Sequence, residues 1–145
     1  GQPRLGPGFS PDNTGMKNLL PKEAWALIQQ QPDTLFVDVR MEIESLYVGR
    51  PPGVENIPWY EYPDMTPDPD RFAAAVVREA GHKERPVLLI CRNGKRTLHA
   101  GEALEAAGFI NVAHVVHGFE GDLDERFRRS VLHSWRHDDL PWEQM

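Results

Sequence analysis

The chain has 145 residues, a formal net charge of −6, 40% hydrophobic residues and one cysteine. This length fits one domain with a substantial core. The acidic balance argues against a broad nucleic-acid surface, no apolar run approaches the roughly 18 residues that a membrane span needs, and a lone cysteine excludes a disulfide-stapled scaffold. We therefore expect a cytoplasmic protein without nucleic-acid or membrane partners, and a periplasmic location also fits.

The first residues differ in composition from the rest. Residues 1–15 are rich in glycine and proline and show little periodicity, which predicts a flexible N-terminal extension or a remnant of cloning. One domain is predicted over 16–145. It begins with a short strand at 17–20, and Pro21 is well placed to start a helix that continues over 22–30.

The middle of the chain predicts two strands and a helix. The apolar run at 35–39 predicts a strand, 42–53 a loop and 54–59 a second, short strand. The Pro- and Asp-rich stretch at 60–70 predicts a surface loop. A helix is expected at 71–80, closed by Gly81, with Phe72, Val76 and Val77 facing inward.

The last third repeats this alternation. The continuous apolar run at 87–90 predicts a parallel strand buried on both faces. A helix is predicted at 97–107, with Leu98, Leu104 and Ala107 inward and Gly108 as its cap. A last strand is predicted at 112–116, a helix at 120–128 and a tail whose tryptophans fold back. Strands alternating with helices predict an α/β fold, a parallel sheet of about five strands with helices on both faces.

A short charged loop follows the apolar run at 87–90. It begins with the only cysteine of the chain, and its sequence is Cys91-Arg92-Asn93-Gly94-Lys95-Arg96. Loop amides and a helix N-terminus favour an anion, and three cations within five residues add to this. Such surroundings favour the thiolate form of a cysteine. We therefore predict that Cys91 is a reactive nucleophile and not a small core hydrophobe.

Several segments resemble the rhodanese family, the single-domain sulfurtransferases. They are the DVR strand at 35–40, the sequence GRPPGVENIP at 49–58, the cysteine loop at 91–96 and the glycine-rich turn at 118–121. In the second, Arg50 and Pro51 stand where the family has His and Ile. Trp135 and the LPW sequence at 140–142 resemble the tail of many prokaryotic members. Their order and spacing over about a hundred residues make the match specific.

The resemblance implies a rhodanese-like sheet and sulfur transfer through Cys91. In that chemistry the thiolate attacks the outer sulfur of a small anionic donor, such as thiosulfate, a persulfide or polysulfide, and becomes a persulfide. An acceptor such as cyanide or a thiol, including a protein thiol, then removes the sulfur. No cofactor is implied.

The loop residues are the expected binding groups for the donor. Gly94 lets successive amides point inward, and the three cations would attract the anion and stabilise departing sulfite. Arg40 follows the strand at 35–39 and is expected either at this anion site or in a structural salt bridge, while Asp38 is expected to hold loop backbone. The predicted substrate-binding residues are Arg92, Asn93, Gly94, Lys95, Arg96 and Arg40.

Two other functions stay open. A related fold carries cysteine-dependent phosphatases with a Cys-x5-Arg loop, one residue longer than the Cys-x4-Arg loop here, and some rhodanese-like domains only bind partners. Histidines are spaced three apart at His114 and His117 and four apart at His133 and His137. Because no Cys or carboxylate group completes either pair, we expect no metal site.

Overall fold

The computed structural model describes residues 16–121 and 134–144. Five strands form one parallel sheet in the order β1-β5-β4-β2-β3. They are β1 Lys17–Leu19, β2 Leu35–Asp38, β3 Glu55–Asn56, β4 Val87–Ile90 and β5 Val112–Val115. The predicted α/β class and five-stranded parallel sheet are confirmed. The predicted extension at 1–15 and most of the predicted helix at 120–128 lie outside the described residues.

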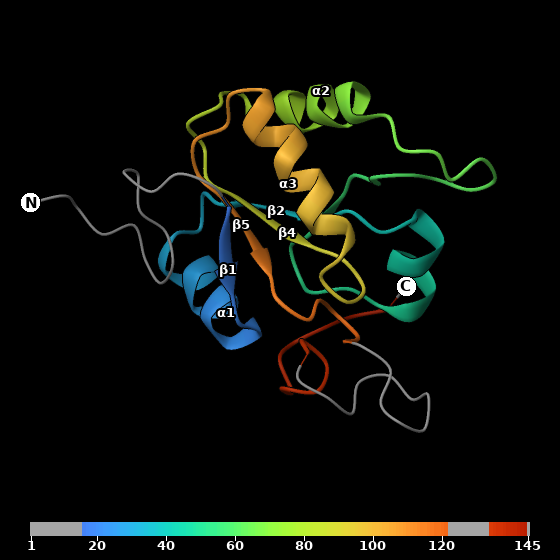
Figure 1. Ribbon diagram of the computed structural model, residues 1–145. Coiled ribbons are helices and arrows are strands. Elements are labelled where there is room, and N and C mark those ends of the chain that lie inside the picture. Colours follow the sequence, from blue (N-terminus) through green and yellow to red (C-terminus); the bar gives the residue numbers. More distant parts are fainter. Residues whose placement is uncertain (1–15, 122–133, 145) are drawn as a thin grey trace, which may run out of the picture.

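Helices cover both faces of the sheet. The structure has α1 at Pro21–Gln30, α2 at Pro69–Ala80 and α3 at Arg96–Ala106. α2 and α3 lie side by side on one face and α1 lies on the other (Figure 1). α2 begins two residues before the expected start, because the Asp68 side chain accepts a hydrogen bond from the Arg71 N–H and Pro69 fits the first turn. No helix in the described ranges is long and apolar enough to cross a membrane.

Two local predictions were wrong. The expected loop at 42–53 contains a short π-helix, η1, at Glu44–Val48. Leu98 was expected to face inward, yet it is 46% exposed. The buried face of α3 is made of Thr97, Ala100, Gly101 and Leu104 instead. These residues recur at helical spacing, and Leu98 lies outside that stripe.

Alternate residues of the central strands face two separate cores. Val37, Leu89 and Cys91 belong to the core beneath α2 and α3, whereas Phe36 and Leu88 belong to the core beneath α1. The second core also contains Trp135, which is fully buried, so this part of the tail folds back as predicted. Both faces of β4 are therefore covered, as its continuous apolar sequence requires.

Candidate active site

Cys91 directly follows the C-terminal end of β4, which lies between β5 and β2 in the sheet. A four-residue connection leads from it into α3, whose first residue is Arg96. The Cys91 side chain is fully buried at the floor of this loop. The sheet thus places the thiol where the C-terminal strand ends of an open α/β fold form their binding crevice.

The loop directs a backbone N–H at the sulfur. The Gly94 N–H donates to Cys91 Sγ over 3.1 Å. Gly94 has φ +94°, a conformation that L side chains rarely adopt, and a Cβ there would lie 3.2 Å from the His117 nitrogen. The Lys95 N–H donates to Asn93 Oδ1 over 3.2 Å, which fixes the turn before α3. Of the successive amides expected to point inward, that of Gly94 meets the sulfur, whereas that of Lys95 bonds to the Asn93 side chain.

The turn at 118–121 holds the opposite side of the loop. The Cys91 carbonyl accepts from the Phe119 N–H over 2.8 Å, and the Arg92 carbonyl accepts from the amides of Glu120 and Gly121 over 2.9 and 3.0 Å. A Cβ at Gly118 would lie only 2.5 Å from the Cys91 oxygen. This close backbone packing explains why the turn that follows the last strand is rich in glycine. The Cys91 and Arg92 carbonyls are therefore taken up by this turn.

The three loop cations have different surroundings. Lys95 is exposed and makes no ion pair within the described part of the chain. Arg92 is half-buried, and its Nε is buried without a hydrogen-bond partner among the described residues. Arg96 instead forms a two-pronged ion pair with Glu44 of η1, at 2.7 and 2.9 Å, and lies 5.2 Å from the centre of the Tyr60 ring. Among the described residues, Arg96 is therefore the loop cation whose charge is neutralised by an ion pair.

The ion pair between Arg96 and Glu44 changes the titration of both groups. Burial by itself raises the pKa of the Glu44 carboxyl, but the hydrogen bonds and charge of Arg96 outweigh burial and bring this pKa below its ordinary value. Burial likewise acts to lower the pKa of Arg96, and Glu44 outweighs it and raises that pKa. Both side chains are therefore charged at neutral pH.

Arg40 lies beside the site but within the core. It is fully buried, its guanidinium donates to both carboxylate oxygens of Asp38 at 2.9 and 2.7 Å, and it also donates to the Gly49 carbonyl at 2.6 Å. The Phe119 ring stacks against it at 4.7 Å. Asp38 also accepts from the Arg40 backbone N–H, so it holds loop backbone as expected. The structure thus contains the salt bridge that the sequence left as the alternative to an anion-binding role for Arg40.

A chain of buried polar groups behind the sulfur was missed in the sequence. The Thr97 hydroxyl lies 3.8 Å from Cys91 Sγ and 2.7 Å from His114 Nδ1. His114 Nε2 lies 2.7 Å from Asn18 Oδ1. These residues come from α3, β5 and β1. The one available sequence signal is the strand period of two, which places His114 on the same face of β5 as Val112.

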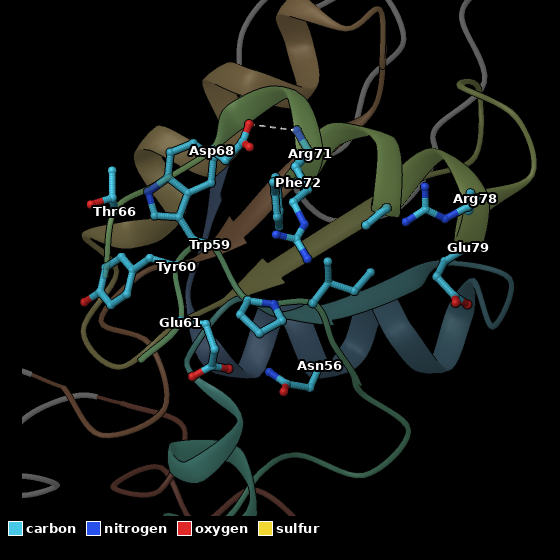
Figure 2. Close-up of a pocket in the computed structure, with 13 residues that line it drawn as sticks. Asn56, Trp59, Tyr60, Glu61, Thr66, Asp68, Arg71, Phe72, Arg78 and Glu79 are labelled. Atoms are coloured by element: carbon cyan, nitrogen blue, oxygen red, sulfur yellow. Dashed lines mark hydrogen bonds between the residues drawn. The ribbon is translucent and has the colours of Figure 1, made fainter. Parts of the chain in front are cut away.

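A separate hollow lies away from the cysteine. It has a volume of about 450 Å³ and opens between α2 and the segment that follows β3 (Figure 2). Arg71 and Arg78 of α2 face Asn56 and Glu61 across it, and Trp59 and Phe72 form an apolar wall. None of the residues 91–96 lines this hollow. Tyr60 links this hollow to the loop, because its ring lies 5.2 Å from the Arg96 guanidinium.

Comparison with known proteins agrees with this architecture. The model of the rhodanese-like domain matches residues 20–125. The crystal structure of Rv0390 from M. tuberculosis is 34% identical, with 91% of this chain and all of that chain covered and a TM-score of 0.76.

Two sulfur-transfer proteins share the fold at lower identity. A thiosulfate sulfurtransferase from Pseudomonas aeruginosa is 18% identical (89% of this chain, 20% of that chain, TM-score 0.65). A polysulfide-sulfur transferase from Wolinella succinogenes is 23% identical (90% and 80%, TM-score 0.59). At these identities the likeness concerns the fold alone. The family match spans most of the chain, and with the sheet order and the cysteine loop in place, the protein belongs to the rhodanese family.

Proposed function

We propose that the protein is a sulfurtransferase that carries sulfane sulfur as a persulfide on Cys91. The donor is thiosulfate or another small anionic carrier, a persulfide or polysulfide, and the acceptor is a thiophilic species such as cyanide or a thiol. The observation that carries this proposal is the Gly94 N–H aimed at Cys91 Sγ, within a loop whose Cys91 and Arg92 carbonyls bond to the turn at 118–121. An amide donor stabilises negative charge on sulfur without itself reacting.

Each half-reaction transfers one sulfur atom, and atoms and electrons are conserved in both. The Cys91 thiolate attacks the outer sulfur of thiosulfate, an S–S bond forms at Sγ, and the S–S bond of the donor breaks with its electron pair leaving on sulfite. Cyanide or a thiolate then attacks the outer sulfur of the Cys91 persulfide, and the electron pair of that S–S bond returns to Sγ. A two-step covalent path of this kind predicts ping-pong kinetics.

The surroundings of the loop support an anionic donor. Lys95 is exposed, and the Arg92 Nε has no hydrogen-bond partner within the described residues, so both can meet a negative group. Arg96 already binds Glu44, which suits it to holding the loop against η1. We assign donor attraction to Arg92 and Lys95, and the shape of the loop to Arg96, Gly94 and Asn93.

The geometry favours sulfur over phosphate. A phosphatase loop of this kind would need an arginine six residues after the cysteine, and here that residue is Thr97, buried and bonded to the Gly94 carbonyl and to His114. A side chain so placed cannot grip phosphate oxygens as a guanidinium does. We expect no Cys91-dependent hydrolysis of a generic aryl phosphate, and robust hydrolysis without sulfur transfer would reverse the assignment.

Mass spectrometry of the intact protein provides the direct test. After incubation with thiosulfate and removal of the donor, the protein should gain the mass of one sulfur, and adding cyanide should remove it with release of thiocyanate. Because Cys91 is the only cysteine, the added mass can be assigned without ambiguity. A protein that stays unmodified by thiosulfate, persulfides and polysulfide alike would be a binding module and not a sulfurtransferase.

A further inference from the structure

Behind the sulfur, one line of polar groups leads from the buried thiol to the protein surface. Cys91 and Thr97 are fully buried and His114 is 4% exposed, while Asn18 lies exposed on β1 at the sheet edge. The successive distances are 3.8 Å from Sγ to the Thr97 hydroxyl, 2.7 Å from that hydroxyl to Nδ1, and 2.7 Å from Nε2 to Asn18 Oδ1. The proposed sulfur transfer does not use His114.

We propose that Thr97 and His114 form a proton relay through which the buried Cys91 thiol exchanges its proton with water beside Asn18. The relay deepens the proposed sulfurtransferase function, because it supplies the thiolate that attacks the donor. It makes His114 a positioning residue that acts on the sulfur through Thr97.

The positions of the hydrogens along the relay follow from the neutral state of the His114 imidazole. Burial lowers the pKa of His114 to about 4, so at neutral pH the ring carries a single N–H. Since Asn18 Oδ1 is an acceptor, that hydrogen lies on Nε2, and Nδ1 accepts the Thr97 hydroxyl hydrogen. The Thr97 oxygen can then accept the S–H hydrogen of Cys91. In the thiol state every donor points outward, from Sγ toward Asn18.

Formation of the thiolate reverses the direction of every hydrogen bond between Sγ and Asn18. The S–H proton passes to the Thr97 oxygen, the Thr97 proton passes to Nδ1, and the Nε2 proton passes to water beside Asn18. One proton leaves, the Thr97 hydroxyl is intact, and His114 is again neutral with its hydrogen on Nδ1. Because Nε2 then has no hydrogen and Asn18 Oδ1 is also an acceptor, the Asn18 amide turns over and its Nδ2 donates to Nε2. With that turn every donor points inward, and the Thr97 hydroxyl can donate to the anionic sulfur or to the Gly94 carbonyl, 3.1 Å away. Hydrogen bonds aligned in one direction strengthen one another, so each state is internally consistent.

The single cysteine permits a test that needs no sulfur donor. In an acidic buffer that keeps the thiol protonated, the infrared S–H stretching band reports Cys91 alone. After rapid dilution into D₂O, His114→Phe and Thr97→Val should lose this band about a hundredfold more slowly than the wild type, the scale of a removed proton-transfer group. Thr97→Ser restores the hydroxyl and should restore fast exchange. His82→Phe is the matched control, because that side chain is 62% exposed and remote from the line.

The outcomes separate the relay from the sulfurtransferase proposal. Wild-type exchange rates in His114→Phe and Thr97→Val would overturn the relay, whatever the thiosulfate result. If His114→Phe does not fold, Thr97→Val against Thr97→Ser decides alone. Slow exchange in the variants, together with a wild type that thiosulfate, persulfides and polysulfide all fail to load, would uphold the relay and overturn the sulfurtransferase. Slow exchange together with slowed persulfide formation supports both.

Discussion

The segments that follow β2 and β4 begin at neighbouring positions of the same sheet edge, since Asp38 pairs with Ile90 in the register of the two strands. After β2, charges neutralise one another: Arg40 is fully buried and takes up both oxygens of Asp38. After β4, an amide faces the sulfur, and Lys95 remains exposed. Residues 38–40 thus form a buried anchor, and residues 91–96 form a cradle around the thiol that we propose to be reactive. A place at the strand ends is therefore not enough to bind an anionic substrate. The site also needs hydrogen-bond donors or cations that are not already paired with a carboxylate of the protein.

Removing the sulfur should abolish the function of the cradle and leave the anchor intact. Cys91→Ser replaces the nucleophile by a much weaker one in a similar volume, so we expect complete loss of thiosulfate:cyanide sulfur transfer. The circular dichroism spectrum should be unchanged. Turnover by this variant at a rate approaching the wild type would show that another group carries the sulfur.

Removing one partner of the anchor should cost stability instead. Arg40→Met leaves Asp38 as a buried charge without its partner, and such a change costs about 3–5 kcal/mol in the free energy of unfolding. Urea titration followed by tryptophan fluorescence measures it. Arg50→Met is the matched control, because Arg50 and Glu143 are 3.7 Å apart with the Glu143 side chain 53% exposed. Exposed pairs are worth about 0–1 kcal/mol, so equal losses in the two variants would contradict the anchor role.

The backbone packing under the cradle can be tested with two glycines. Gly118 and Gly81 both have positive φ, +63° and +85°, but a Cβ at Gly118 meets the Cys91 and Arg92 backbone at 2.5–2.7 Å whereas a Cβ at Gly81 meets nothing within 4 Å. Backbone strain alone costs about 1 kcal/mol or more for alanine. Gly118→Ala should therefore destabilise the protein more than Gly81→Ala and should also slow persulfide formation, which stopped-flow loading would measure. Equal effects of the two substitutions would mean that the Cys91 and Arg92 backbone can move aside for a Cβ at Gly118 without loss of function.

The local structure of the cradle was predicted better than its contacts with residues that are distant in the sequence. The strand at 87–90, the turn at Gly94 and the position of Cys91 at the start of the loop follow from local pattern, because apolar runs, glycine and a helix start act over a few residues. The complete burial of Cys91 was not predicted. Arg96 was expected at the donor, and its partner Glu44 is 52 residues away on a π-helix that the sequence presented as loop.

Long-range partners also explain the other differences. His114 contacts Thr97 and Asn18, 17 and 96 residues away, and such pairs depend on strand order, which hydrophobic period does not encode. The prediction that Leu98 faces inward failed for a local reason. The buried stripe of α3 passes through Ala100 and Gly101, where a Cβ at Gly101 would meet the Met16 side chain, and small residues at these positions give a weak sequence signal.

Releasing Arg96 should make the cradle more attractive to anions. Glu44→Gln keeps the shape of the side chain and removes the charge that neutralises Arg96, so the KM for thiosulfate should fall roughly threefold, the scale of one partly exposed ion pair. Because the fold lowers the Glu44 pKa, this pair stabilises the protein at pH above the ordinary carboxyl range, and the contribution is lost as pH falls through the lowered value. The acid-induced loss of stability should therefore be smaller in Glu44→Gln. A raised KM would mean that Glu44 serves the donor by holding Arg96 in place.

The smallest effect should come from the exposed cation. Lys95→Ala removes a charge that no ion pair within the described residues neutralises, at the residue before α3, so the KM for thiosulfate should rise about twofold at low salt with kcat unchanged. Salt at physiological strength should erase most of the difference, because it screens charges beyond about 8 Å. Lys83→Ala removes the same charge from the segment before β4, at the far end of that strand, and separates a local effect from a change in net charge. If both variants raise KM equally, the acidic body as a whole governs donor capture, and the contrast between cradle and anchor lies in the backbone amides alone.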